Sequence, residues 1–484
     1  MFQDNESDLS VFWDSNWKTS TVKNYASTQT SEILTNEAET QSHHLQDFAC
    51  QCAIQKEAAV VHVDEKEVPG LCEFLQRVEP KITACLKENL TSHAFDGYEV
   101  LWEDQCDSAH CIYTLTDPGT DGLQCTDVSW SSSGAMLVAS YGRHDHENWC
   151  THKGLVCMWN LSSGKLTADK ADSAVDVDNC VMCVACYPSE AGVIAGGTFS
   201  GEVKVWHFAG NSKWVVVSSS AEVNAHKEPV TSIRWLSSSQ PVADNNQLVS
   251  LASDGCVILW KIDLQAKKVE IVRQFTLHVP GKRVLTDITG SYGGTCLTFP
   301  YQDNNTFVAG CETGSLFKCS LHVSGEKTLT QSPVTFSFQP HNGPVYDVQC
   351  SPYHRNLFLS CGTNSTCQLY SLIESQPLLS LTPSYGYLFS ASWSPSRPCV
   401  FAVGSQQGYV LVYDLAENMV NPVIKLASDN KKLAAVYCVK FNRSRPHILA
   451  SGDEHGIVRV WHVSSKLALQ QTNELEVVNT IAEP

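Results

Sequence analysis

Along residues 120–465 the hydrophobic and polar positions repeat one pattern. In its clearest copy, ILASGDEHGIVRVW, small residues lead into a polar turn with a glycine, and an alternating segment then ends at Trp461. Period-two alternation predicts a β-strand rather than a helix. Further copies of this pattern end at Trp159, Trp206, Trp260, Cys319, Tyr370 and Tyr413. The sequence therefore predicts seven similar units built from short strands.

A glycine marks the turn in most of these units. It stands five positions before the last residue of the unit, at Gly154, Gly201, Gly255, Gly314, Gly408 and Gly456. Glycine allows the positive φ that a tight hairpin turn needs. The unit that ends at Tyr370 has Ser365 in this place. Another short strand precedes each pattern, and several of these strands end in tryptophan, as at Trp130, Trp235 and Trp393.

The repeat length and the strand pattern predict an all-β fold. Unit ends are separated by between 43 residues (Tyr370 to Tyr413) and 59 residues (Trp260 to Cys319), whereas one propeller blade of the WD40 type has about 40–45 residues before loop insertions. Small four-stranded sheets that pack radially bury their faces against each other. We expect a seven-bladed β-propeller over residues 121–472, with six or eight blades as the nearest alternatives.

Two segments could close the ring of this propeller. The outer strand of the last blade could come from residues 466–471, which follow the last unit, or from residues 111–116, which precede the first.

The units resemble the WD-repeat family, although the Trp-Asp pair is missing at their ends and Tyr413 followed by Asp414 comes closest. The Gly-His element of that family has only weak counterparts, at His226 and His341.

The segment in front of the repeats has a different composition. Residues 1–66 are polar, rich in Ser, Thr, Asn, Gln and acids, and lack sustained periodicity. Such a segment cannot bury enough apolar surface to order itself, so we expect a disordered tail. It contains a Thr-Gln-Thr motif, and a weaker Thr-Gln-Ser motif follows it. The residues of interest in the two motifs are Ser27, Thr28, Gln29 and Thr30, and then Thr40 and Gln41.

Residues 67–92 predict an amphipathic helix. Apolar side chains follow i, i+3, i+4 spacing and form one stripe, made of Leu71, Phe74, Leu75, Val78, Ile82 and Leu86. Pro80 is expected to kink this helix or to split it in two. The stripe could pack on the propeller as a lid, or it could dock in the groove of a partner protein. Residues 93–120 are expected to be a linker with an N-terminal strand, and residues 473–484 a C-terminal tail.

Composition narrows the possible functions. The net charge of −18 over 484 residues disfavours general binding to nucleic acids and to anionic membranes. The 21 cysteines are scattered singly through apolar runs, which is typical of buried thiols in a reducing compartment. The N-terminus has no apolar core of a signal peptide, and no run reaches the roughly 18 apolar residues of a membrane helix. We therefore expect an intracellular protein without membrane insertion.

Metal and catalytic patterns are weak. Cys180, Cys183 and Cys186 have zinc-like spacing, but Cys183 and Cys186 should point to opposite faces of a strand. His144 and His146 lie in an insertion without a companion at metal-ligand spacing. Nucleophile, phosphate-loop and dinucleotide motifs are missing, and aspartates in the repeat turns should make turn hydrogen bonds. We expect no metal, no cofactor and no catalytic residues.

Several segments together resemble a dynein intermediate chain. They are the Thr-Gln-Thr tail, the amphipathic helix, the SHAFDG junction and the degenerate propeller. The strings YGRHDHENW, GTFSGEVKVW, SPYHRNLFLS and WSPSRP resemble, more narrowly, the WD-repeat intermediate chains of cytoplasmic dynein-2, the motor of retrograde intraflagellar transport.

This resemblance implies a non-catalytic scaffold of the cytoplasm and the cilium, at the axoneme and basal body. The tail motifs would bind an LC8-type light chain as an added β-strand, and the helix would bind a roadblock-type light chain. The propeller would bind the dynein-2 heavy chain, beside a second dynein-2 intermediate chain. Candidate propeller contacts are the insertions at residues 143–152 and 282–295. The alternatives are a WD-repeat adaptor in ubiquitin ligation or chromatin, and an enzymatic propeller with its substrate in the channel.

Overall fold

Alternating apolar residues and turn glycines produce short antiparallel strands throughout the second part of the chain. The computed structural model describes residues 70–91, 109–146, 150, 152–164, 166–209, 213–219, 225–236, 246–264, 266–279, 291–301, 303–322, 331–427, 434–471 and 473–482. The chain divides into two compact units, residues 1–98 and residues 99–484. The first contains helix α1 (Leu71–Thr91), and the second contains all of the described strands.

These strands form seven antiparallel sheets of four strands each. The first three sheets are β2 (Gln124–Trp130), β3 (Met136–Gly142), β4 (Gly154–Asn160) and β5 (Ser173–Val177); β6 (Val181–Cys186), β7 (Val193–Thr198), β8 (Val203–Ala209) and β9 (Lys213–Ser218); and β10 (Val230–Trp235), β11 (Asn246–Ala252), β12 (Cys256–Asp263) and β13 (Lys268–Thr276). The next two are β14 (Gly294–Thr298), β15 (Thr306–Cys311), β16 (Leu316–Ser320) and β17 (Val334–Ser337); and β18 (Val345–Cys350), β19 (Leu357–Gly362), β20 (Cys367–Ser371) and β21 (Pro377–Leu381). The last two are β22 (Leu388–Trp393), β23 (Val400–Ser405), β24 (Tyr409–Asp414) and β25 (Ile424–Ala427); and β26 (Val436–Phe441), β27 (Ile448–Asp453), β28 (Val458–His462) and β1 (His110–Leu115).

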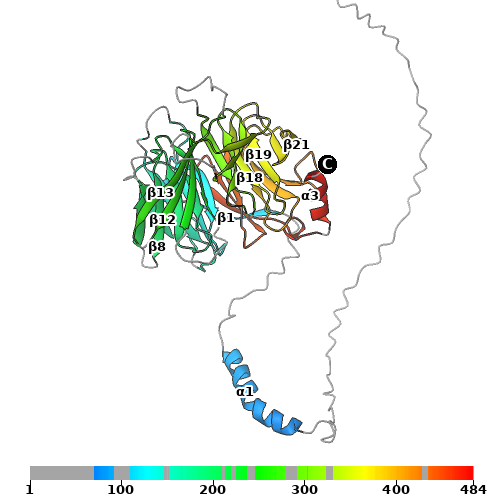
Figure 1. Cartoon of the computed structure of the whole chain (residues 1–484). Helices are drawn as coiled ribbons and strands as arrows, with labels where there is room; N and C mark the ends of the chain where they lie inside the picture. Colours follow the sequence, from blue (N-terminus) through cyan, green and yellow to red (C-terminus); the bar gives the residue numbers. More distant parts are fainter. Residues whose placement is uncertain are drawn as a thin grey trace, which may run out of the picture. The chain divides into compact units, whose positions relative to one another are not determined.

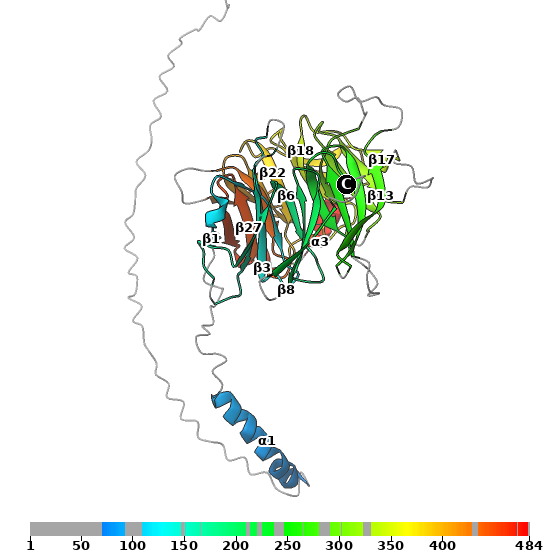
Figure 2. The same ribbon diagram turned by 90° about the vertical axis from the view of Figure 1, so that its left-hand side faces the viewer.

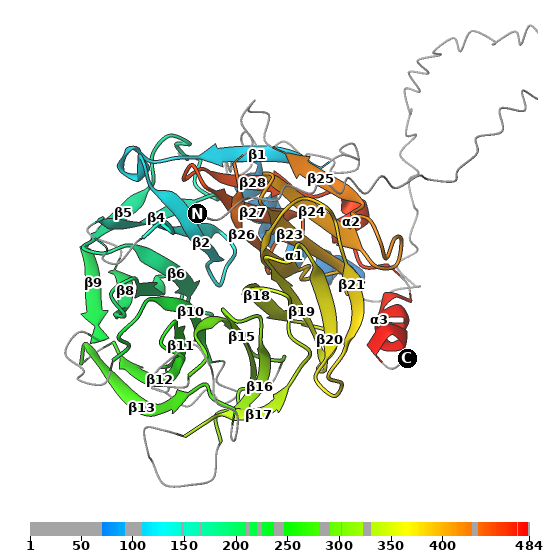
Figure 3. The same ribbon diagram turned by 90° about the horizontal axis from the view of Figure 1, so that it is seen from above.

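The sheets are arranged as the blades of a propeller (Figure 1). The first strand of each blade, from β2 to β26, contacts the first strand of the next blade, and β26 contacts β2. Viewed from above, the seven blades are arranged in a ring (Figure 3). The predicted all-β, seven-bladed propeller is therefore confirmed.

The last residue of each predicted unit lies in the third strand of a blade and is buried. Trp260, for example, is fully buried and pairs with Leu248 of the neighbouring strand. In five blades the glycine five positions earlier closes the hairpin between the second and third strands with a positive φ, whereas Gly154 is the first residue of β4 and has no positive φ. Gly255 has φ +74°, and an added Cβ would lie 2.5 Å from the backbone oxygen of Tyr292. Ser365, which replaces this glycine in one blade, keeps a positive φ of 59°.

Strand β1 closes the ring. It pairs antiparallel with β28, with His110 opposite His462 and Leu115 opposite Val458. The two strands lie side by side at the rim, although they come from opposite ends of the propeller sequence (Figure 2). Of the two expected closures, the strand near residues 111–116 is therefore correct. Residues 466–471 do not close the ring, because β1 already occupies the edge of β28 and the chain turns into helix α2 (Ser465–Ala468).

A helix also forms in the segment interpreted from the sequence as a C-terminal tail. Helix α3 (Glu474–Ala482) lies at the rim of the propeller (Figure 3). Val478 and Ala482 are buried in a core cluster that also contains Leu411 and Tyr413. The 3–4 spacing of these apolar positions places them on one face of the helix, but nine residues give a weak sequence signal.

Tryptophans connect neighbouring blades. The Nε1 atom of Trp130 donates a hydrogen bond to the Lys440 carbonyl at 3.0 Å, and that of Trp235 donates to the Ala185 carbonyl at 2.9 Å. Each tryptophan ends the first strand of its blade and reaches the first strand of the blade before it. A buried indole N–H needs such a partner, so these residues help to fix the spacing of the blades. Helix α1 and the other helices in the described part of the chain are too short or too polar to cross a membrane.

Candidate functional sites

Helix α1 presents an exposed apolar stripe. The side chains of Phe74, Leu75, Ile82 and Leu86 are 49–57% exposed, and Leu71 and Val78 are partly exposed. The helix runs through Pro80 without a break, so of the two effects expected of this proline, a kink or a division, the division is wrong. A proline removes one backbone hydrogen bond, and the remaining turns retain theirs. All six predicted stripe residues are brought onto a single helix.

The predicted tail motifs lie outside the described residues. Ser27, Thr28, Gln29 and Thr30, together with Thr40 and Gln41, remain predictions from the sequence.

His226 belongs to a buried hydrogen-bonded group in the blade of β10–β13. Its Nε2 atom lies 2.6 Å from Ser250 Oγ, and Trp260 Nε1 donates to the same oxygen at 2.7 Å. The Nδ1 atom of His226 faces Asp254 Oδ1 at 3.6 Å. Burial raises the pKa of Asp254, but the interactions with His226 and the backbone N–H groups of Cys256 and Lys227 together outweigh burial and leave the pKa lowered. His226, the weak counterpart of the Gly-His element in the sequence, therefore has a structural role inside this blade.

A second group of this kind surrounds His341. Its Nε2 lies 2.7 Å from Ser360 Oγ, and its Nδ1 lies 3.1 Å from Asn364 Oδ1. An amide thus takes the place that Asp254 has in the other blade. Burial lowers the pKa of His341, and the bond to Asn364 offsets this only in part. His341 is therefore held in its neutral form.

Aromatic side chains form an arc across three neighbouring blades. In three successive blades the second residue of the first strand forms a bulge, and this residue is Tyr346, Phe389 or Tyr437. Ring centroids are 5.0 Å apart between Tyr346 and Phe389 and 5.0 Å between Phe389 and Tyr437. His144, from the loop between β3 and β4, packs edge-on to Tyr437 at 4.9 Å. Partly exposed aromatic clusters are typical of protein-binding hot spots, so we define these four residues as the aromatic arc.

The first strands end at a positively charged cavity. It has a volume of about 330 Å³ and is lined by Arg234, Lys440 and Arg443, beside Trp130 and Trp235. Lys440 Nζ lies 3.6 Å from Asp347 Oδ2, which neutralises part of this charge. In a chain with net charge −18, such a cavity suits an acidic side chain or another anionic group. Two of these cations lie in the alternating segments IRW and VKF, and strand alternation alone gives no signal for a cavity.

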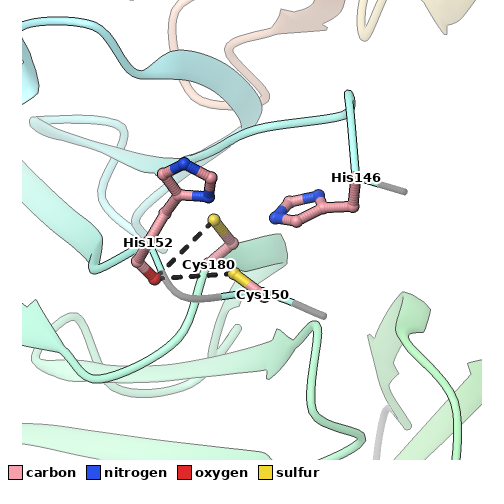
Figure 4. Close-up of side chains that lie close together, drawn as sticks. All are labelled: His146, Cys150, His152 and Cys180. Carbon is pink, nitrogen blue, oxygen red and sulfur yellow. Dashed lines mark hydrogen bonds between the residues drawn. The ribbon is translucent and has the colours of Figure 1, made fainter. Parts of the chain in front are cut away.

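Four metal-ligand side chains converge between the first two blades. His146, Cys150 and His152 come from the loop between β3 and β4, and Cys180 directly precedes β6. One ligand atom from each residue lies within 4.8 Å of the other three. The two sulfur atoms lie between the two imidazole rings (Figure 4). Burial, and next the contact with Cys150, raise the pKa of the Cys180 thiol to about 12.

The sequence patterns divided this cluster. Cys180 was grouped with Cys183 and Cys186, but the structure places Cys180 with the histidine loop instead. Cys183 donates a hydrogen bond to the Val230 carbonyl at 3.4 Å, inside the core. Of the two histidines in this loop, His146 lies beside other metal-ligand side chains and His144 does not belong to the cluster. The companion ligand was missed because it comes from another blade, and only the sequence string HENWCTH gave a local signal.

Comparisons with known proteins agree with this architecture. A family profile described as the Dynein axonemal intermediate chain 3 WD40 domain matches residues 300–463. Cytoplasmic dynein 2 intermediate chain 2 of Mus musculus is 37% identical over 93% of this chain and 86% of its own length. The chain is a member of the dynein intermediate chain family. The human protein of the same name is 36% identical over 86% of this chain and 80% of its own length.

More distant relatives belong to the same family. Cytoplasmic dynein 1 intermediate chain of Drosophila melanogaster is 25% identical over 88% of this chain and 63% of its own length. As a dynein intermediate chain, the protein is a structural subunit rather than an enzyme. The resemblance drawn from the sequence is therefore confirmed.

Proposed function

We propose that this chain is a scaffold subunit of cytoplasmic dynein-2, in which the N-terminal unit recruits light chains and the propeller binds the heavy chain. The identity of 36–37% to cytoplasmic dynein 2 intermediate chain 2 over most of the chain supports the placement in dynein-2. The observation that carries the scaffold role is the exposed apolar stripe of α1. About half of the surface of Phe74, Leu75 and Ile82 is open to solvent, which is a large apolar exposure for one short helix.

Helix α1 is proposed to dock on a roadblock-type light chain. An amphipathic helix that lies in a groove uses anchors at i, i+3 or i+4, and i+7. Leu71, Phe74, Val78 and Ile82 supply this spacing, and Leu75 and Leu86 widen the same stripe. The tail motifs around Gln29 and Gln41 are proposed to bind an LC8-type light chain.

The aromatic arc is proposed as a contact for the dynein-2 heavy chain. Tyr346 is 39% exposed and Tyr387 nearby is 44% exposed, and tyrosine combines a large apolar surface with a hydroxyl that can remain hydrated. His144 brings the start of the insertion at residues 143–152 into the same surface. A second dynein-2 intermediate chain would bind the complex elsewhere. The assembly would act in retrograde intraflagellar transport and cilium assembly, at the axoneme and basal body.

Affinity purification of the full-length chain from ciliated cells tests this function. We expect mass spectrometry to recover the dynein-2 heavy chain, a second intermediate chain and both classes of light chain. Replacing Tyr346 and Phe389 by alanine should reduce recovery of the heavy chain without loss of the light chains. A matched control replaces the exposed residues Val272 and Tyr301, which lie outside the arc, by alanine.

Two outcomes would contradict the proposal. If no dynein heavy chain is recovered with the wild-type chain, the placement in dynein-2 is wrong. If components of a ubiquitin ligase or of chromatin are recovered in its place, the adaptor function is the better interpretation. Unchanged heavy-chain recovery with the arc variant would remove the aromatic arc from the interface.

A further inference from the structure

The cluster of His146, Cys150, His152 and Cys180 has the composition of a structural zinc site. Two thiols and two imidazoles within 4.8 Å of one another form the Cys₂His₂ donor set of closed zinc sites. Both cysteines are free rather than joined in a disulfide. Zinc–ligand bonds of about 2.0–2.3 Å require the donor atoms to move inward by roughly 1 Å, which side-chain rotation in a surface loop can supply.

The histidines of this cluster have unsatisfied polar atoms. His146 Nδ1 and Nε2 and His152 Nδ1 are buried without a hydrogen-bond partner in the described residues. A buried polar atom without a partner costs free energy, and most such atoms in proteins have one. The two thiols donate only long hydrogen bonds to the His152 carbonyl, at 3.5 Å from Cys150 and 4.0 Å from Cys180. A cation at the centre would bind one nitrogen of each ring and both sulfurs together.

We propose that these four residues bind one Zn²⁺ ion that fastens the loop between β3 and β4 to the second blade. Sulfur and imidazole ligands in a tetrahedral set favour zinc over calcium or magnesium, which prefer oxygen. All four positions are filled by protein side chains, so the site is structural and has no open position for a substrate. Phe199 covers one side, with its ring stacked on His146 at 4.1 Å.

The zinc ion would also hold the aromatic arc in place. His144 stands two positions before the ligand His146 and packs on Tyr437 in the last blade. Arg143 is paired with Asp145 at the base of the same loop. A metal that fixes His146 and His152 therefore restricts the loop that carries His144 to Tyr437.

Metal analysis of the full-length chain tests the proposal. The chain is purified under reducing conditions and dialysed, and zinc is measured by mass spectrometry of the metal. We expect about one zinc ion per chain. Exchange with Co²⁺ should give the thiolate-to-cobalt absorption band and the strong visible bands of a tetrahedral site.

Variants identify the ligands. Cys150→Ser together with Cys180→Ser should lose the zinc and the cobalt spectrum, as should His146→Ala together with His152→Ala. Cys186→Ser and His144→Gln are matched controls, because they change the same residue types nearby but outside the cluster, and they should keep both signals. If a ligand variant unfolds, amide hydrogen exchange of the wild-type chain, measured with and without zinc, takes the place of that variant. Removal of zinc should speed the exchange of backbone amides in residues 143–153 and leave the exchange of β14–β17 unchanged.

Three results would overturn the zinc site. The first is that the wild-type chain contains less than stoichiometric zinc and also does not bind Co²⁺ with tetrahedral geometry. The second is a disulfide between Cys150 and Cys180 in protein isolated from cells, found by non-reducing peptide mapping in place of the metal. The third is that folded ligand variants still bind zinc, or that removal of zinc leaves amide hydrogen exchange near residues 143–153 unchanged. Loss of dynein subunits from the purified complex would not bear on these measurements, so the two proposals can fail separately.

Discussion

Arg397 forms a buried ion pair with Glu474, the first residue of helix α3. Both side chains are almost completely inaccessible to solvent, and the Arg397 guanidinium also lies 2.9 Å from Asp414 Oδ2. A further N–H of Arg397 donates to the Lys466 carbonyl at the end of the last blade. One arginine before β23 therefore holds the C-terminal helices to the propeller.

Removal of Arg397 should destabilise the propeller strongly. Arg397→Ala leaves the carboxylates of Asp414 and Glu474 buried without a counter-ion, which costs about 3–5 kcal/mol of unfolding free energy. Denaturant unfolding of the full-length chain measures this. Lys466→Ala is the control, because it breaks only the exposed ion pair with Glu417, worth about 0–1 kcal/mol. A similar small loss for both variants would contradict the role given to Arg397.

Acid should destabilise the blade that contains His341. Its pKa in the folded chain is lowered by burial, so the unfolded chain binds a proton more readily as the pH falls below about 6.5. The stability that His341 contributes is complete above that pH and is lost below it. The midpoint of thermal unfolding should therefore fall as the pH is lowered from 7.5 to 5.5.

A single substitution tests the cause of this acid sensitivity. Asn364→Asp places a carboxylate beside Nδ1 of His341, as Asp254 stands beside His226. The carboxylate should raise the pKa of His341 and make the unfolding midpoint less sensitive to acid. Asn421→Asp adds the same charge at an exposed position and should not have this effect. Equal pH dependence in both variants would exclude His341 as the cause.

The repeated strand pattern was sufficient to predict the blades. Period-two alternation and a glycine at fixed spacing report local structure, and Gly255 and Trp260 lie where that spacing requires. The metal-ligand cluster is different, because Cys180 joins His146 only after two blades have packed. Residues that meet through blade packing have no fixed sequence spacing, so motif spacing could not find them. Helix α3 was missed for a related reason, since its burial depends on contacts with β24.

The α1 stripe should be required for the roadblock-type light chain. Phe74→Asp together with Val78→Asp introduces two charges into the apolar face and should abolish co-purification of that light chain. Gln76→Asp together with Ala84→Asp adds the same charge on the other side of the helix and should preserve it. Heavy-chain recovery reports whether the propeller remains folded. Unfolding of the propeller by the stripe variant alone would favour the lid interpretation.

The Thr-Gln-Thr motif should bind the LC8-type light chain. We expect a peptide of residues 25–32 to bind in a calorimetric titration, and Gln29→Ala together with Thr30→Ala to abolish binding, because the glutamine and threonine side chains fill pockets beside the added strand. In the full-length chain, Gln29→Ala with Gln41→Ala should lose the light chain, whereas Gln3→Ala with Thr19→Ala should retain it. Retention of the light chain by the Gln29 and Gln41 variant would show that these motifs are not the site.

The pairing of β1 with β28 has a consequence for synthesis of the protein. Ribosomes make β1 first among the described strands and β28 last, so the first strand waits for its partner until almost the whole chain has emerged. Long-range pairing of this kind is slow, and an unpaired strand edge is prone to aggregation. A nascent chain therefore carries one open edge through most of its translation. Premature termination anywhere before His462 leaves that edge unpaired, so truncated chains are expected to depend on chaperones or to be degraded.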